Sequence, residues 1–250
     1  MPVFHHGSVE IAYLDEGVGE PVVLVHGFAS NKETNWVHTS WFTTLKGAGR
    51  RVIALDNRGH GLSSKLYEAS DYHTDKMASD VVALMRELEI ERADVMGYSM
   101  GARITAFVAL THPALVRSAI LGGLGYRLVE GYGLPETVAD ALEVPTLAEI
   151  TDPQGYAFRD FAERTRSDRR ALAACIRGSR QVLTREQAAS IQTPVLIAVG
   201  TKDTVAGSAD ELAAVLPNAR ALHLPGRDHM LAVGDKAFKA GVLEFLREHQ

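Results

Sequence analysis

The sequence has little cysteine, no excess of positive charge and no long apolar run. Its single cysteine, Cys175, cannot form an internal disulfide, and one thiol without nearby partners gives no zinc site. Lys and Arg number 26 against 31 Asp and Glu, so the net charge of -5 offers no basic field for a nucleic-acid backbone. No apolar run is long enough to span a bilayer, and residues 1–7 lack the profile of a secretory signal. We therefore expect no nucleic-acid or membrane partner and a cytoplasmic location.

What the sequence does contain is a regular alternation of strand and helix patterns. With 46% hydrophobic and 23% charged residues, the composition is that of a globular protein. Apolar runs typical of strands covered on both faces lie at residues 22–25, 52–55, 94–96, 118–121 and 195–199. Helical patterns lie between and after them, at residues 77–88, 102–110 and 238–246. This order predicts an α/β fold with a mostly parallel, twisted sheet and helices on both faces, preceded by an antiparallel edge strand at residues 9–13.

One stretch interrupts the alternation. Between residues 124 and 190 no strand-like run is found, and three prolines separate short amphipathic segments. We interpret it as a small helical insertion in a core domain formed by residues 1–123 and 191–250. The insertion is rich in arginine, which we assign to a solvated helix face, with a carboxylate-recognising patch as the alternative. These arginines are Arg159, Arg164, Arg166, Arg169 and Arg170.

The strongest chemical signal is the pentapeptide Gly97-Tyr98-Ser99-Met100-Gly101. It lies directly between a strand that ends at residue 96 and an apolar helix that starts at residue 102. A serine at such a turn has a strained backbone, and the flanking glycines let strand and helix pack closely beside it. Ser99 is therefore the candidate nucleophile.

A serine hydroxyl needs a base, and the base needs a carboxylate that fixes its tautomer. His229 follows the expected last strand, residues 219–224, and Asp203 follows the strand at 195–199, so both loops open at the edge that carries Ser99. Asp228 is the rival acid, but adjacent side chains in an extended loop project apart. His26 and His60 lie in loops at the same edge, and we expect them to hold those loops in shape. His223 lies inside the strand at 219–224 and His249 ends the last helix, so structural roles are favoured for them; His5 and His6 are too near the N-terminus to be placed and lack partners for a metal.

The pentapeptide resembles a motif of the α/β-hydrolase family, as do His26-Gly27-Phe28 and the loop at residues 56–63. The resemblance covers essentially the whole chain. The order Ser99, Asp203, His229 is the family order. The resemblance also implies that the backbone N–H groups of Phe28 and Met100 form an oxyanion hole. It implies too that the insertion is a cap over the serine. The glycines at residues 56–63 match neither phosphate-loop nor dinucleotide spacing, and the resemblance implies that this stretch braces the active-site edge, with structural roles for Asp56, Arg58 and Gly61.

The expected function is hydrolysis of a small to medium, mainly apolar carboxylic ester through an acyl-enzyme, with no cofactor or metal. The expected pocket residues are Tyr98, Tyr126, Leu128, Tyr132 and Phe158. Three alternatives use the same scaffold: an enol-lactone or carbon–carbon bond hydrolase of aromatic degradation, a perhydrolase or haloperoxidase-like enzyme, and a hydrolase-like protein that binds a ligand. The sequence leaves the oligomeric state open.

Overall fold

The computed structural model describes residues 1–131 and 134–249, and its centre is an eight-stranded sheet with the order β1-β2-β4-β3-β5-β6-β7-β8. The first two strands are antiparallel and the rest run parallel to one another. The strands are β1 (Val3–His6), β2 (Val9–Glu16), β3 (Glu20–Val25), β4 (Arg50–Leu55), β5 (Ala93–Tyr98), β6 (Val116–Gly122), β7 (Val195–Gly200) and β8 (Ala219–Leu224). The predicted α/β fold with a mostly parallel sheet is confirmed.

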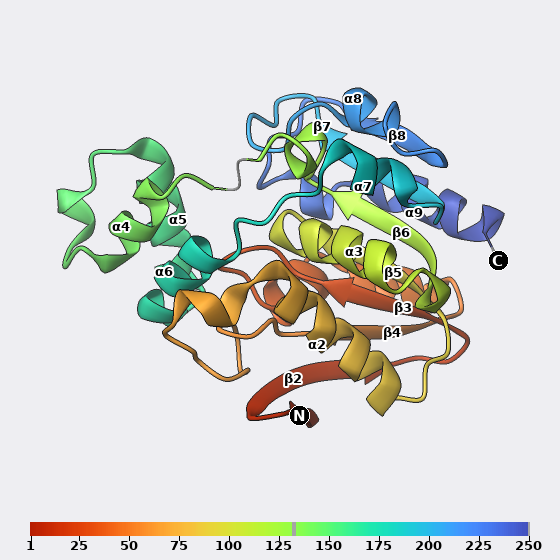
Figure 1. Cartoon of the computed structure of the whole chain (residues 1–250), viewed down its shortest axis with the longest axis horizontal. Helices are drawn as coiled ribbons and strands as arrows, with labels where there is room; N and C mark the ends of the chain where they lie inside the picture. The colour runs from red at the N-terminus through yellow and green to blue at the C-terminus, as the bar shows by residue number, and fades with distance from the viewer. Residues whose placement is uncertain (132–133, 250) are drawn as a thin grey trace.

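Helices cover both faces of this sheet (Figure 1). They are α1 (Trp41–Gly47), α2 (Thr74–Glu87), α3 (Met100–Thr111), α4 (Thr137–Glu143), α5 (Pro153–Arg164), α6 (Arg169–Gly178), α7 (Arg185–Ser190), α8 (Ala209–Ala213) and α9 (Lys236–Glu248). Helices α1 and α9 share one apolar cluster with the sheet, and α2, α3 and α8 share another. The result is a three-layer arrangement with a core on each side of the sheet.

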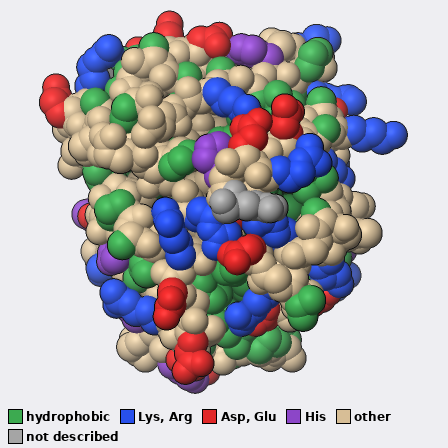
Figure 2. Space-filling model, turned by 90° about the vertical axis from the view of Figure 1, so that its right-hand side faces the viewer, with side chains coloured by type: hydrophobic (Ala, Val, Ile, Leu, Met, Phe, Trp, Pro, Cys, Tyr) green, Lys and Arg blue, Asp and Glu red, His purple; other side chains and the backbone are tan. Residues whose placement is uncertain are grey.

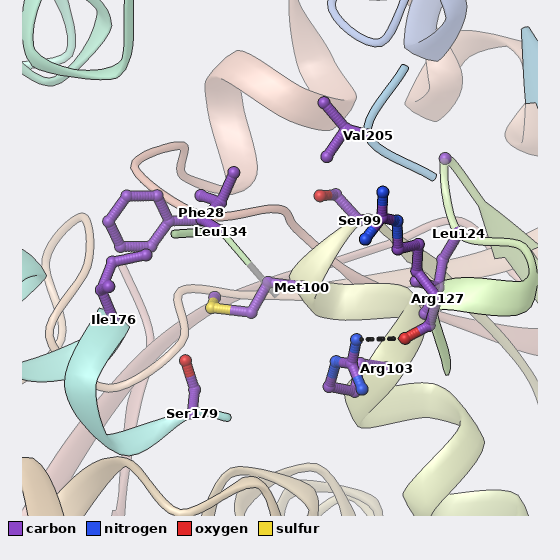
Figure 3. Close-up of a pocket in the computed structure, with 11 residues that line it drawn as sticks. Phe28, Ser99, Met100, Arg103, Leu124, Arg127, Leu134, Ile176, Ser179 and Val205 are labelled. Carbon is purple, nitrogen blue, oxygen red and sulfur yellow. Dashed lines mark hydrogen bonds between the residues drawn. The ribbon is translucent and has the colours of Figure 1, made fainter. Parts of the chain in front are cut away.

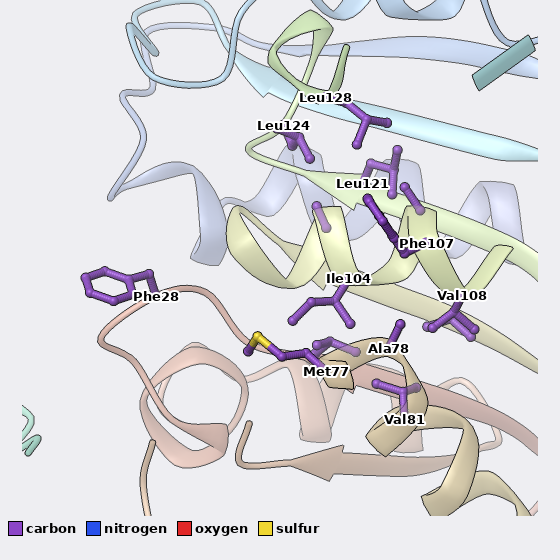
Figure 4. Close-up of a cluster of buried hydrophobic side chains, with 14 of the residues drawn as sticks. Phe28, Met77, Ala78, Val81, Ile104, Phe107, Val108, Leu121, Leu124 and Leu128 are labelled. Atoms are coloured by element: carbon purple, nitrogen blue, oxygen red, sulfur yellow. The ribbon is translucent and has the colours of Figure 1, made fainter. Parts of the chain in front are cut away.

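Successive side chains of the central strands enter opposite cores. Val23 and Val25 of β3 belong to the cluster that contains α2 and α3, whereas Val22 and Leu24 belong to the cluster that contains α1 and α9. Figure 4 shows the first cluster, in which side chains from α2, α3 and β6 meet between the helices and the sheet. Because both faces are covered, these strands are apolar without alternation, as the sequence predicts.

The N-terminal edge differs from the prediction in one respect. The alternating segment at residues 9–13 does form an antiparallel strand, β2, but β1 pairs with it and takes the edge position. The short run Val3–His6 has only Phe4 buried. Four residues with one apolar anchor give too weak a period to stand out in a sequence.

The described part of the segment between β6 and β7 contains helices joined by loops, and no strand. Helices α4, α5 and α6 pack on one another and project from the edge where the parallel strands end (Figure 1). Helix α7 instead packs against α3 of the core. We refer to α4–α6 as the cap. The limits of the insertion, residues 124 and 190, stay a prediction.

The surface far from the cap carries charges of both signs. Figure 2 shows that acidic and basic side chains are intermixed on that face, without a large area of one sign. Among the helices that the structure describes, none has the length and apolar character needed to cross a membrane.

Candidate active site

The turn between β5 and α3 places Ser99 at the edge of the sheet that faces the cap. Its backbone has φ 54° and ψ -112°, a strained conformation for a residue with a side chain. The backbone N–H of Ser99 donates to the carbonyl of Gly122 at 2.7 Å. A Cβ atom on Gly97 would lie 2.1 Å from the carbonyl oxygen of Gly101, and one on Gly101 would lie 2.0 Å from that of Val25. Both glycines are therefore required by the close packing of α3 on the strands.

Ser99, His229 and Asp203 form a hydrogen-bonded row. Nε2 of His229 lies 2.9 Å from Oγ of Ser99, and Nδ1 lies 2.7 Å from Oδ2 of Asp203. A carboxylate accepts only, so Nδ1 carries the proton and Nε2 is left to accept from the serine hydroxyl. The structure thus brings together three side chains that are up to 130 residues apart in the sequence.

The Asp203 carboxylate is fully buried and held on both oxygens. Its Oδ1 accepts from the backbone N–H groups of Val205 and Ala206, at 2.8 and 3.0 Å. Burial acts to raise the pKa of this carboxyl, but the hydrogen bonds from His229 and from the two N–H groups outweigh burial and lower the pKa below its usual value. Asp203 therefore stays ionised beside the imidazole.

Asp228, the rival acid, has a different task. Its Oδ1 accepts from the backbone N–H groups of Met230 and Leu231, so it shapes the loop that carries the histidine. The same loop is held from the other side by Tyr98, whose hydroxyl donates to the backbone carbonyl of His229 at 2.5 Å. Burial raises the pKa of this phenol well above its ordinary value, so it remains a donor.

Phe28 and Met100 supply the candidate oxyanion hole. Phe28 follows β3, and Met100 is the first residue of α3, where a helix leaves its N–H groups without intrahelical partners. Within the described part of the chain, neither backbone N–H donates to another protein group. The loop before Phe28 is fixed by the Asn35 side chain, whose Oδ1 accepts from the N–H of Gly27 at 2.9 Å.

His26 and His60 lie buried behind this loop. Nδ1 of His26 donates to the carbonyl of Gly27 at 2.7 Å, and Nε2 accepts from the backbone N–H of Asn57 at 3.0 Å. The His60 ring packs at 5.2 Å from His26 and at 5.8 Å from the Phe28 ring, between centroids. Burial lowers the pKa of both imidazoles, to about 3 for His60. They are neutral side chains that tie the loops after β3 and β4 together.

The loop at residues 56–63 contains buried ion pairs that support the site from behind. Asp56 accepts from the Nζ of fully buried Lys32 at 2.6 Å, and from the backbone N–H groups of Lys32 and Leu62. Arg58 binds Asp80 on α2 through two nitrogens at 2.7 Å. We predicted a bracing role for this loop from the family resemblance, but nothing in the sequence marks Lys32 as the partner.

Two cavities meet at Ser99, with empty volumes of about 510 and 700 Å³ that are partly open to solvent. Ser99 and Phe28 line both. The larger cavity is also lined by Tyr98, His229 and Phe158, among others. The smaller cavity extends over Met100 and the first turns of α3 (Figure 3).

The predicted pocket residues divide between these cavities and the core. Tyr98 and Phe158 line the larger cavity. Leu128 is instead fully buried beside Leu124 in the core (Figure 4), and Tyr126 packs on that core with its hydroxyl near Arg185. Neither residue is among those that line the two cavities, because the chain turns back onto α8 before it enters the cap. Tyr132 lies outside the described residues.

The five arginines assigned to a solvated helix face, Arg159, Arg164, Arg166, Arg169 and Arg170, do not line the two cavities at Ser99, whereas Arg127, near the start of the predicted insertion, lines the smaller one. Arg159 is buried and donates to the carbonyls of Ala141 and Val144, so it fastens α5 to the end of α4. Arg164 pairs with Asp160 at the surface. Sequence reasoning missed a different arginine, Arg103 of α3, which does line the smaller cavity. A lone charge in the otherwise apolar segment 102–110 is the signal that could have found it. In the described ranges, no cluster of three or more His, Cys, Asp or Glu side chains could hold a metal ion.

A parallel sheet whose strand ends carry a hydroxyl, an imidazole and a carboxylate in this order defines the class of the α/β hydrolases. A model of the alpha/beta hydrolase fold matches residues 20–181 of the sequence. The chain therefore belongs to the α/β-hydrolase family.

Similar proteins carry several different activities in their names. A non-heme chloroperoxidase of Kitasatospora aureofaciens is 28% identical over 96% of this chain and 97% of its own. The acetyltransferase component of an acetoin-cleaving system of Pseudomonas putida is 32% identical over 92% of this chain, which spans 64% of that longer protein. The crystal structure of a bromoperoxidase from Bacillus anthracis superposes with a TM-score of 0.78 at 26% identity, covering 96% of each chain. The comparisons thus leave the substrate open.

Proposed function

We propose that the protein is a serine hydrolase that cleaves small to medium carboxylic esters through an acyl-enzyme. The observation that carries the proposal is the row Ser99–His229–Asp203, with hydrogen bonds of 2.9 and 2.7 Å. Ser99 attacks the ester carbonyl while Nε2 of His229 takes the hydroxyl proton, and the carbonyl oxygen becomes negative. The N–H groups of Phe28 and Met100, with the start of α3, stabilise that charge.

Collapse of the tetrahedral intermediate requires a proton on the leaving alkoxide, and the imidazolium of His229 donates it. The alcohol part of the ester must therefore lie on the His229 side of Ser99. There the larger cavity is lined by apolar side chains that include Phe158, Phe161 and Met230. This lining supports an apolar alcohol group. Water then enters the same position, His229 removes its proton, and the acyl group leaves Ser99.

The test is the loss of turnover when the row is broken. Ser99→Ala or His229→Ala should lower kcat for an activated ester by about a millionfold, because the nucleophile and its base act as a unit. Intact-mass analysis with a fluorophosphonate should show one label per folded chain and none for Ser99→Ala. An unlabelled wild-type Ser99, with no hydrolysis across a panel of acyl lengths, would refute the proposal.

A second candidate is perhydrolysis, because two similar proteins carry peroxidase names. It would use the same acyl-enzyme, with hydrogen peroxide in place of water as the second nucleophile. Formation of peracid from acetate and hydrogen peroxide by the wild type, and its absence in Ser99→Ala, would support this reaction. Ester hydrolysis without any peracid would exclude it.

A further inference from the structure

Arg103 is a buried cation without a counter-ion among the residues that the structure describes. It lies one turn after Ser99 in α3, and only 5% of its surface is exposed. The other buried Lys and Arg side chains of the described chain each have an acidic partner, in the pairs Lys32–Asp56, Arg50–Asp94, Arg58–Asp80 and Arg159–Glu163. For Arg103, no carboxylate of residues 1–131 or 134–249 lies within ion-pair distance. A buried charge without a partner is costly, so its retention calls for a reason.

The Arg103 side chain has a structural role that uses part of its hydrogen-bonding capacity. Its two terminal nitrogens donate to the backbone carbonyls of Gln181 and Arg127, each at 2.9 Å. Arg127 lies in the connection that leads into the cap, and Gln181 lies in the connection that leads out of it. Arg103 therefore links these two connections. These contacts use two of the five N–H groups of the guanidinium. Neutral donors could bind the same two carbonyls, so the contacts do not explain why a charged side chain lies here.

Arg103 also lines the smaller cavity at Ser99. Figure 3 shows Arg103 and Arg127 on the same side of this cavity, below and beside Ser99. Ser179 also lines it, with its hydroxyl donating to the backbone carbonyl of Cys175, and none of the described residues that line the cavity is acidic. Among the described residues, the Arg127 side chain forms no ion pair either. The cavity therefore combines two positively charged guanidinium groups with a mostly apolar lining.

The position of this cavity relative to His229 decides which part of a substrate enters it. The leaving alcohol must lie beside His229, which lines the larger cavity and not the smaller one. The acyl part then extends in the other direction, over Met100 toward Arg103. We propose that the smaller cavity binds an acyl group that ends in a carboxylate, so that the substrate is a monoester of a dicarboxylic acid. This inference rests on the proposed acyl-enzyme chemistry and adds the substrate class.

The test compares benzyl esters that differ only in the charge at the far end of the acyl chain. Monobenzyl glutarate and benzyl pentanoate have acyl chains of the same length. Monobenzyl succinate and monobenzyl adipate shorten and lengthen the chain that carries the carboxylate. We expect kcat/KM for the best monoester to exceed that of its neutral match at least about tenfold, as hydrogen bonds to charged groups allow. Equal or faster turnover of the neutral ester at all three lengths would overturn the inference.

Variants assign the preference to these side chains. Arg103→Met should lower the ratio of charged to neutral ester turnover by about tenfold to a hundredfold. Because Arg103 also supports the cap, Arg127→Met provides a second test that removes no buried contact to those carbonyls, and the ratio should again fall. Arg164→Met removes one positive charge from the cap surface and should leave the ratio unchanged. An unaltered ratio in both Arg103→Met and Arg127→Met would refute the assignment.

Binding without turnover separates this inference from the proposed function. Calorimetric titration of Ser99→Ala with monobenzyl glutarate and benzyl pentanoate reports the charge preference with no chemical step. Tighter binding of the monoester, together with no ester hydrolysis by the wild type, would refute the esterase and keep the anion subsite. Hydrolysis of neutral esters by the wild type, with no binding preference in Ser99→Ala, would refute the subsite and keep the esterase.

Discussion

The carboxylate of Asp203 fixes which nitrogen of His229 carries the proton. It accepts from Nδ1 at 2.7 Å and is itself held by the N–H groups of Val205 and Ala206. A carboxylate can only accept in this position, so Nε2 faces Ser99 as a base. A single residue thereby sets the tautomer and stabilises the imidazolium that forms during attack.

Asp203→Asn tests this role, because it replaces one carboxylate oxygen by an NH₂ group. An amide can donate to Nδ1 and favour the opposite tautomer, with the proton on Nε2, so kcat should fall by about ten-thousandfold. Steady-state hydrolysis of an activated ester measures the loss, and circular dichroism checks that the variant is folded. Asp228→Asn is the matched control, because its side chain keeps an oxygen for the N–H groups of Met230 and Leu231. An equal loss in both variants would contradict a specific role for Asp203.

At the scale of elements, the position of Ser99 depends on how closely α3 approaches the sheet. Gly97 and Gly101 leave no space for a methyl group, since each hypothetical Cβ lies within about 2 Å of a backbone carbonyl oxygen. A backbone atom cannot move away as the end of a flexible side chain can. The helix and the turn are therefore fixed as one unit.

Gly101→Ala should push α3 away from β3 and displace Ser99. We expect a loss of about 1 to 3 kcal/mol in the free energy of unfolding from overpacking, and about a hundredfold loss in kcat from misplacement of the nucleophile. Urea unfolding and ester hydrolysis measure the two effects. Gly47→Ala serves as control, because a Cβ at Gly47 in α1 meets nothing within 4 Å. Full activity in Gly101→Ala would show that the turn tolerates the extra atom.

At the scale of the whole molecule, the buried neutral histidines make stability depend on pH. His60 has its pKa lowered to about 3, mainly by burial and next by the neighbouring His26, while Asp56 opposes and Lys65 adds to the effect. The unfolded chain binds a proton on this histidine below about pH 6.5, whereas the folded chain does not until about pH 3. The unfolded state therefore holds more protons in this window, and stability must fall as the pH is lowered through it.

The expected slope is about 1.4 kcal/mol per pH unit for each such histidine. Urea unfolding of the wild type at several pH values between 7 and 4 should show the decline. His60→Asn keeps a donor for the carbonyl of Arg58 and removes one titrating group, so its slope should be shallower by that amount, whatever its stability at pH 7. Identical slopes would mean that His60 is protonated in the folded protein.

The fold and the reactive row were accessible from sequence because their signals are local. Apolar runs predict the strands β3 to β7, and the glycines around Ser99 identify the turn by their spacing. Asp203 and His229 each follow a strand, and parallel strands end at one edge, so their convergence follows from topology. Strand β1, with one buried residue out of four, gave no comparable signal.

The amino-acid sequence by itself thus determined the class of fold and the members of the row Ser99–His229–Asp203, because periodicity and turn chemistry act over a few residues. Only the tertiary structure decided which side chains line the cavities and why Leu128 is in the core. It also decided that Lys32 pairs with Asp56, while Arg103 has no acid beside it in the described part of the chain. Those outcomes depend on packing between segments far apart in the chain, where orientation and distance are not encoded in any short pattern.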